Sequence, residues 1–256
     1  CLKLVLGLQS VPLSPVGLVK KIGHQPCFTE GLILLDGNLY ESCGGYNSST
    51  VRILSASLGE VLAEVSLPHG HFAEGLTVHG SHVFVTTWKQ RTIHVLHVES
   101  LSTLGKLTFT NDRNQGWGLT TNDHELVMSD GSSALYFYEL PVNVSEVREL
   151  VLIRKLNVFS DGQLPVNLLN ELEYVDDSIF ANVWLSDIIV KIDAETGAVT
   201  RIYDISMLSQ PSRAQSRVVG RDLGDVVPNG IAYCAQDGSF VLTGKLWPHH
   251  FVVRLP

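Results

Sequence analysis

The sequence predicts an all-β fold made of five repeats, and two sets of aligned residues carry that prediction. The first set is a short motif, Glu-Gly-Leu or a variant of it, which begins at Glu30, Glu74, Trp117, Asn170 and Asn229. The second set is the end of the apolar segment that follows each motif, at Gly44, Trp88, Gly131, Trp184 and Lys245. Successive members are 44, 43, 53 and 59 residues apart in the first set and 44, 43, 53 and 61 in the second. Repeats of about 40–50 residues with several strands each are typical of a β-propeller.

Apolar segments separated by turn residues divide each repeat into strands. The first repeat is expected to hold strands near 31–35, 39–43, 51–56 and 60–67, with a turn at Asp36-Gly37-Asn38. The second is expected to hold them within 75–80, 81–88, 91–98 and 105–110. The third and fourth follow within 119–131, 134–140, 150–158, 172–184, 188–199 and 200–205. The segments 165–172 and 206–217 show weak helical periodicity and are expected to be loops or single turns.

The fifth repeat is one strand short, because the chain ends after the segments 230–245 and 250–256. The unassigned segment Val16–Gly23, VGLVKKIG, can supply the missing strand. Pairing the N-terminal strand with the last blade would close the ring and remove an exposed sheet edge. Because one blade cannot bury its faces alone, residues 1–256 are expected to form a single five-bladed propeller domain.

The composition is that of a globular protein, with 45% hydrophobic and 17% charged residues. The net charge of −8 and the lack of any block of five or six like charges argue against a nucleic-acid partner. The sequence contains no run of about 18 apolar residues, so no membrane span is predicted. We expect a monomer.

The first set of aligned residues predicts a site at one mouth of the central channel. Equivalent positions of successive blades surround one axis, so the five side chains should meet there. Glu30 and Glu74 occupy the same place in adjacent repeats, and two neighbouring carboxyls raise the pKa of one of them, which suits general acid–base catalysis. Lys245 could offset this effect or hold a developing oxyanion.

Aromatic residues are expected to line the same mouth. Trp88, Trp184 and Lys245 end equivalent strands, and Trp117 belongs to the motif itself. Phe28 and Phe72 each precede a motif glutamate by two residues. These rings would wall a pocket, or alternatively they would only plug a narrow channel.

Glu41 is the one acidic residue at a position that is apolar in the other repeats, where Val85, Met128, Ala181 and Leu242 stand. A buried carboxylate is costly unless it is used or paired. Glu41 therefore either contacts the substrate or pairs with Arg52.

The cysteines and two sequons bear on the compartment. Cys27 and Cys43 flank a hairpin, and they form either a disulfide or two buried thiols. Sequons at Asn47 and Asn143 favour the secretory pathway, extracellular or vacuolar, with the apolar start of the chain as the remnant of a processed leader. The histidines show no HExxH pattern, and no metal ligands are expected.

Ten motifs in order resemble the plant and bacterial type of glutaminyl-peptide cyclotransferase. They are HQPCFTEGL (24–32), LYES (39–42), SSTVR (48–52), FAEGLT (72–77), GWGLTT (116–121), MSDGS (128–132), LNELEYV (169–175), ANVW (181–184), NGIAY (229–233) and TGKLWP (243–248). The resemblance covers about residues 16–255 and implies a five-bladed propeller. It also implies conversion of N-terminal glutamine to pyroglutamate with loss of ammonia and without a catalytic metal. Whether the channel holds a structural ion is left open.

The resemblance implies a pocket made of Phe28, Glu30, Phe72, Glu74, Trp88, Trp117, Asn170, Trp184 and Lys245. We expect Glu74 to shuttle a proton, and Lys245 and Asn170 to polarise the carbonyl oxygen. Glu30 and Glu41 would hold the substrate amine. The substrates would be peptides or proteins with N-terminal glutamine, whose side chain the tryptophans would clamp.

Two other functions fit the same scaffold. One is a propeller that only binds a partner, because a fold does not determine an activity. The other is a calcium-dependent hydrolase in which Asn170, Asn229 and Glu30 form a cation cage.

Overall fold

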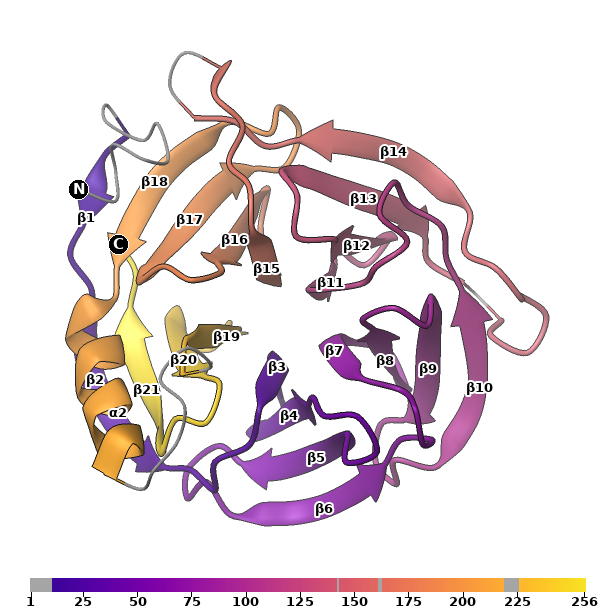
Figure 1. The fold of residues 1–256 in the computed structure, drawn as a ribbon, viewed down its shortest axis with the longest axis horizontal. Coiled ribbons are helices and arrows are strands. Elements are labelled where there is room, and N and C mark those ends of the chain that lie inside the picture. The colour runs from indigo at the N-terminus through magenta and orange to yellow at the C-terminus, as the bar shows by residue number, and fades with distance from the viewer. Residues whose placement is uncertain (1–10, 142, 161–162, 219–225) are drawn as a thin grey trace.

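Five sheets, antiparallel except for one short strand, stand around a central axis in the structure, a computed structural model that describes residues 11–141, 143–160, 163–218 and 226–256 (Figure 1). Each sheet is one blade, and one strand of each blade lies nearest the axis. The five-bladed propeller predicted from the repeats is therefore confirmed.

The strands of each blade follow the chain from the axis outward in the first four blades. Blade one contains β3 (Thr29–Leu35), β4 (Asn38–Cys43), β5 (Thr50–Ser55) and β6 (Val61–Ser66). Blade two contains β7 (Ala73–His79), β8 (His82–Thr87), β9 (Thr92–His97) and β10 (Thr103–Thr108). Blade three contains β11 (Leu119–Thr121), β12 (Glu125–Ser129), β13 (Ala134–Glu139) and β14 (Leu152–Asn157). Blade four contains β15 (Leu169–Val175), β16 (Ser178–Val183), β17 (Ile188–Asp193) and β18 (Val199–Asp204).

The fifth blade joins the two ends of the chain. It contains β19 (Pro228–Cys234), β20 (Ser239–Gly244) and β21 (His249–Arg254), and β2 (Gly17–Gly23) pairs with β21 as its outermost strand. The predicted closure by the N-terminal strand is confirmed. A two-residue strand, β1 (Leu13–Ser14), also runs parallel to β18 on the outside of blade four, which the sequence did not predict.

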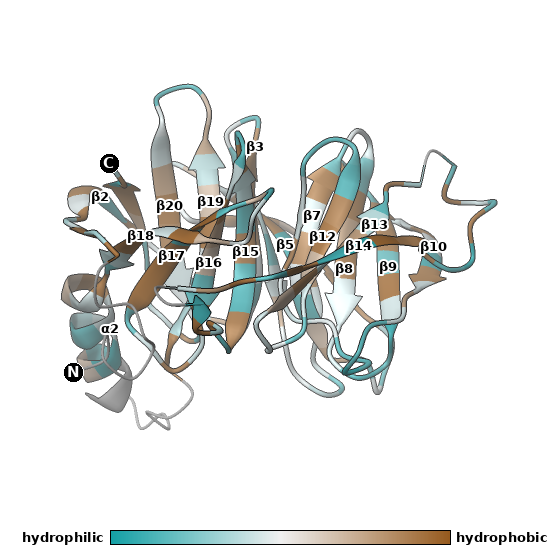
Figure 2. Ribbon diagram, turned by 90° about the horizontal axis from the view of Figure 1, so that it is seen from above, coloured by the Kyte–Doolittle hydropathy of each residue, from teal (hydrophilic) through white to brown (hydrophobic). Residues whose placement is uncertain are grey.

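Apolar side chains fill the space between successive blades. Val83 and Val85 of β8 pack toward blade one, whereas Phe84 between them packs toward blade three. Successive side chains of a strand point to opposite faces, and both faces of a blade are buried, so such strands read as continuous apolar runs. In the side view, apolar stretches occupy the middle of many strands and polar residues gather in the turns (Figure 2).

A helix, α2 (Ser206–Val218), connects blade four to blade five where a loop or single turn was expected. Its sequence carries few apolar residues and includes Pro211, which breaks helical hydrogen bonding, so local signals are weak. Tertiary contacts hold it instead. Leu208 is buried, and the Arg213 guanidinium pairs with Asp187 and donates from Nε to the Val226 carbonyl oxygen at 3.1 Å.

The segment 165–172, also expected to be a loop, contains the start of β15. Among the described residues, no helix has the length and apolar character needed to cross a membrane.

Candidate active site

A recurring irregularity in the innermost strands presents the first set of aligned residues. In blades one, two, four and five, the pairing between the innermost strand and its neighbour shifts by one residue at the motif. The shifts fall between Thr29 and Gly31, Ala73 and Leu76, Leu169 and Leu172, and Pro228 and Ile231. A β-bulge bends its strand and redirects a side chain, and bulges are frequent beside active sites.

Glycine follows the aligned residue because the innermost strands approach closely there. A Cβ atom added to Gly31, Gly75 or Gly118 would collide with the backbone of the next blade. Blade four has Glu171 instead. Its carboxyl accepts hydrogen bonds from the Leu32 amide at 3.1 Å and the Ile231 amide at 2.9 Å, so it links three blades across the axis. This role was not predicted, although Glu171 stands where the other four repeats have glycine, which was a visible signal.

A cavity of about 270 Å³ opens where these aligned residues meet. The nine residues that line it are Phe28, Glu30, Phe72, Glu74, Trp88, Trp117, Asn170, Trp184 and Lys245. They come from all five blades, and they are the nine that the resemblance assigned to the pocket.

Glu30 and Lys245 form an ion pair in the cavity wall. The Lys245 Nζ atom lies 2.7 Å from Oε1 and 2.7 Å from Oε2 of Glu30. The Asn229 side chain, although it does not line the cavity, donates from Nδ2 to Glu30 Oε2 at 3.1 Å and to the Thr29 carbonyl oxygen at 3.0 Å. Two groups of blade five, Lys245 and Asn229, therefore hold the Glu30 carboxylate of blade one in place.

Glu74 has the more strongly raised pKa of this pair of acids. Burial raises the pKa of Glu74 well above its usual value, and the neighbouring Glu30 carboxyl raises it further, while Lys245 opposes both effects. Burial also raises the pKa of Glu30, but its contact with Lys245 opposes that rise. The close contact with Lys245 therefore favours the charged form of Glu30 more than that of Glu74.

The remaining walls are aromatic. Trp117 and Trp184 meet edge to face, with ring centroids 5.5 Å apart and planes at 88°. Phe72 contacts both Phe28 and Trp88, at 6.2 and 5.8 Å between centroids. Lys245 Nζ also lies 4.6 Å from the Phe28 ring centroid, within reach of a cation–π interaction. The rings therefore surround a small polar centre instead of plugging the channel.

Comparisons with known proteins decide the family of this chain. A family model described as glutamine cyclotransferase matches residues 5–255. A glutaminyl-peptide cyclotransferase from Arabidopsis thaliana is 32% identical over 245 residues, which cover 95% of this chain and 72% of that protein. The chain belongs to the glutamine cyclotransferase family. The crystal structure of Myxococcus xanthus glutaminyl cyclase matches with a TM-score of 0.82 and 30% identity over 96% of this chain and 98% of that one.

In this member of the glutamine cyclotransferase family, Glu41 does not line the cavity, in contrast to the expectation that it contacts the substrate. Its carboxyl is fully buried and accepts from Thr29 Oγ1 at 2.6 Å and from Arg52 Nε at 2.8 Å. His24 Nε2 lies 3.1 Å away. Although burial opposes the shift, His24 and Arg52 hold the pKa of Glu41 well below its usual range. The alternative, pairing with Arg52, is the arrangement observed.

Two buried groups of side chains in the described part of the chain could place three ligand atoms near one another. The ligand atoms of His24, Glu41 and His250 all lie within 4.8 Å of one another, but the Arg52 guanidinium already forms an ion pair with the Glu41 carboxylate. A cation there would face this fixed positive charge, so the residues fit a metal poorly. The second group contains Cys27 and Cys43, which are joined as a disulfide. A structural ion in the channel of this cyclotransferase stays a prediction.

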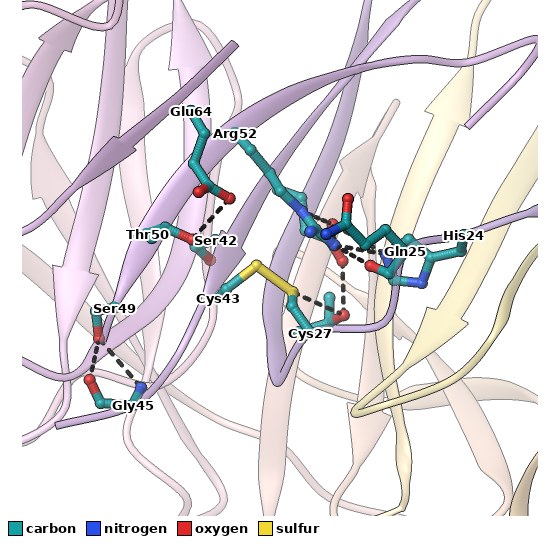
Figure 3. Close-up of a disulfide and its surroundings, with 12 residues drawn as sticks. His24, Gln25, Cys27, Ser42, Cys43, Gly45, Ser49, Thr50, Arg52 and Glu64 are labelled. Atoms are coloured by element: carbon teal, nitrogen blue, oxygen red, sulfur yellow. Dashed lines mark hydrogen bonds and ion pairs between the residues drawn. A yellow bond between two sulfur atoms is a disulfide. The ribbon is translucent and has the colours of Figure 1, made fainter. Parts of the chain in front are cut away.

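The Cys27–Cys43 disulfide closes a hairpin beside the cavity (Figure 3). Each cysteine precedes a residue of the cavity region, Phe28 and Gly44, and the Gly44 amide donates to the Phe28 carbonyl oxygen at 2.8 Å. The disulfide thus ties the segment that carries Phe28 and Glu30 to the end of β4. Of the two possibilities for these cysteines, the structure has the disulfide.

Proposed function

We propose that this member of the glutamine cyclotransferase family converts the N-terminal glutamine of peptides and proteins into pyroglutamate with release of ammonia. One observation carries the proposal: a buried pair of acids and a lysine lie together inside a cavity with aromatic walls. Family membership supports the same reaction.

The reaction closes a five-membered ring within one residue. The neutral α-amine attacks the side-chain amide carbon, and a tetrahedral intermediate with an oxyanion forms. The bond from that carbon to the amide nitrogen then breaks, and ammonia leaves after the nitrogen gains a proton. One proton therefore moves from the attacking amine to the departing nitrogen, and no water is consumed.

Glu74 is the proposed carrier of that proton. A general acid–base group works best when its pKa lies near the working pH, and the raised pKa of Glu74 moves it toward neutrality. Glu74 would take the proton from the amine and give it to the leaving nitrogen. The Glu30 carboxylate, held by Lys245 and Asn229, would attract the amine without becoming protonated itself.

Lys245 and Asn170 are the proposed donors to the oxyanion. Fixed donors aimed at a developing negative charge are worth more in a water-poor site than in solution. The Asn170 side chain is buried, and no described residue donates a hydrogen bond to its Oδ1 atom. Its amide could therefore donate to the substrate oxygen from Nδ2 and accept a substrate N–H at Oδ1.

The tryptophans would set the conformation of the substrate. Trp88, Trp117 and Trp184 surround the acids, so a glutamine side chain would be enclosed with its amide carbon near its own amine. Enclosure would also limit access of water and favour ring closure over hydrolysis of the amide.

The test is ammonia release from a short peptide with N-terminal glutamine in the presence of EDTA, with mass spectrometry of the product. Loss of one ammonia that persists in EDTA is expected for a cyclotransferase without a catalytic metal. Activity that disappears with EDTA would favour the calcium-dependent hydrolase, and no reaction would favour a binding platform. Against the calcium cage, the Asn229 amide donates to Glu30 and Lys245 places an ammonium beside it.

We also propose a secretory location, extracellular or vacuolar. The disulfide supports an oxidising compartment, and Asn47 and Asn143 are both exposed at their sequons. A mobility shift after endoglycosidase treatment of the protein from its native source would test the glycosylation.

A further inference from the structure

One side chain outside the cavity holds two of its tryptophans. The Gln115 Oε1 atom accepts a hydrogen bond from Trp88 Nε1 at 2.9 Å and from Trp117 Nε1 at 3.1 Å. Trp88 follows β8 of blade two and Trp117 precedes β11 of blade three. An indole has a single N–H and is a donor only, so this one oxygen fixes how both rings are turned.

Gln115 is itself held in place by its neighbours. The Asn111 side chain donates from Nδ2 to the Gln115 carbonyl oxygen at 2.7 Å and accepts from the Gln115 amide at 3.2 Å. The next residue, Gly116, donates from its amide to the Trp88 carbonyl oxygen at 3.0 Å. Gln115, whose side-chain oxygen binds the indoles, thus lies in a connection that Asn111 holds internally and that Gly116 ties to Trp88 at the end of β8.

The two indoles transmit this order to the rest of the aromatic wall. Trp88 contacts Phe72, and Trp117 contacts Trp184, at 5.8 and 5.5 Å between ring centroids. Phe72, Trp88, Trp117 and Trp184 therefore form one continuous wall in which Gln115 joins the two halves. Without Gln115, each half could turn independently of the other.

We infer that Gln115 is a positioning residue for the reaction, acting through Trp88 and Trp117 without lining the cavity. The inference rests on the proposed function for its kinetic consequence. Gln115 keeps the two indole planes in the arrangement that encloses the substrate side chain. Loss of its oxygen would let the rings turn and would reduce the fraction of bound substrate that is placed for ring closure.

The kinetic test compares three variants with the wild type, using ammonia release from a peptide with N-terminal glutamine. Gln115→Leu keeps the size and removes the acceptor, Gln115→Glu keeps the acceptor, and Gln236→Leu makes the same change at an exposed turn at the opposite end of blade five. Because both indoles lose their acceptor, kcat/KM of Gln115→Leu should fall roughly 10-fold, which corresponds to about 1.4 kcal/mol in the barrier. Gln115→Glu should keep most of the wild-type value, and Gln236→Leu should match the wild type.

A spectroscopic readout separates positioning from general stability and does not depend on activity. In a proton–nitrogen spectrum of the labelled tryptophans, Gln115→Leu should shift the indole N–H signals of Trp88 and Trp117. The Trp247 signal serves as an internal reference, because that ring is buried and no described residue accepts from its Nε1. The thermal midpoint should change little.

Several outcomes would overturn the inference. One is unshifted Trp88 and Trp117 signals in Gln115→Leu, and another is Gln115→Glu losing as much activity as Gln115→Leu. If Gln115→Leu does not fold, Gln115→Ala and Gln115→Glu carry the same comparison. If the wild type releases no ammonia, the proposed function fails, while the indole signals still decide whether Gln115 orders the rings.

Discussion

Two clusters of buried polar side chains, one with the acids Glu30 and Glu74 and the other with the acid Glu41, behave in opposite ways. Glu30 and Glu74 both line the cavity, where Lys245 pairs with Glu30 and is the lysine that the two carboxyls share. Glu41, eleven residues after Glu30, is as deeply buried but has Arg52, His24 and Thr29 around one carboxyl. The pKa of Glu74 is raised because burial and Glu30 both disfavour its charge, whereas the partners of Glu41 outweigh its burial and lower its pKa.

The difference shows that burial alone does not mark a catalytic acid. A buried carboxylate with a full set of partners is a structural element. Its lowered pKa keeps it ionised at neutral pH, so it has no proton to donate. A buried carboxyl that must share one cation with a second acid has a raised pKa, so it can exchange a proton at a pH nearer neutrality. Substitutions in the two clusters should therefore separate activity from stability.

Glu74→Gln should have the largest effect on activity. The amide keeps the size of the side chain but cannot carry a proton, and general acid–base groups contribute roughly 100- to 10,000-fold to a rate. We expect kcat to fall by a factor in that range in the ammonia-release assay, with an unchanged circular dichroism spectrum. Normal turnover with an unchanged pH profile would show that the proton moves through another group.

Glu41→Gln should lower the stability of the fold and have little effect on activity. Removing one partner of a buried ion pair leaves Arg52 without its counter-charge, which typically costs about 3–5 kcal/mol of unfolding free energy. Urea unfolding monitored by tryptophan fluorescence should show this loss, and the folded fraction should keep a kcat within about 10-fold of wild type. Full stability together with a loss of turnover comparable to that of Glu74→Gln would return Glu41 to the substrate site.

Lys245→Met should lower activity less than Glu74→Gln does. Removing one fixed donor to an oxyanion typically costs about 100- to 1,000-fold in kcat. A suitable control is Lys191→Met in β17, because Lys191 also lies over an aromatic ring, at 5.5 Å from the Phe180 centroid, but outside the cavity. If both variants lost activity equally, the effect would come from lost packing and not from the site.

The contrast between the clusters also explains what could be predicted from the sequence. Aligned positions of the repeats map onto one end of equivalent strands, so the ring and the position of Glu30 and Glu74 followed from spacing. The closure by β2 followed from the strand that the fifth repeat lacks. Glu41 stood out as the one acidic residue at an otherwise apolar position of the repeats. Whether it contacts the substrate or an ion-pair partner depended on its cross-strand neighbour. Arg52 lies directly opposite Glu41 in the register of β4 and β5, and this pairing was one of two readings.

Features without a repeating equivalent could not be predicted in this way. Gln115 lies in a connection between blades, and its role depends on the turn of two indoles. Helix α2 has few apolar residues and an internal proline, and it is held by the contact of Arg213 with Asp187, which lies in the turn between β16 and β17. Such contacts join side chains from separate parts of the fold, so no local sequence pattern predicts them.

The pH dependence of stability should distinguish the two clusters most finely. The folded pKa of Glu74 is raised, so above the ordinary value of 4.5 the folded state binds more protons than the unfolded state and stability falls as pH rises. Glu74→Gln removes this effect and should become increasingly stable relative to wild type as pH rises above that value. The folded pKa of Glu41 is lowered, so its contribution is complete above 4.5 and is lost as pH falls below it. The destabilisation caused by Glu41→Gln should therefore shrink toward acidic pH. Urea unfolding of both variants and wild type at several pH values measures the two trends, and parallel trends would mean that the two acids do not differ in protonation.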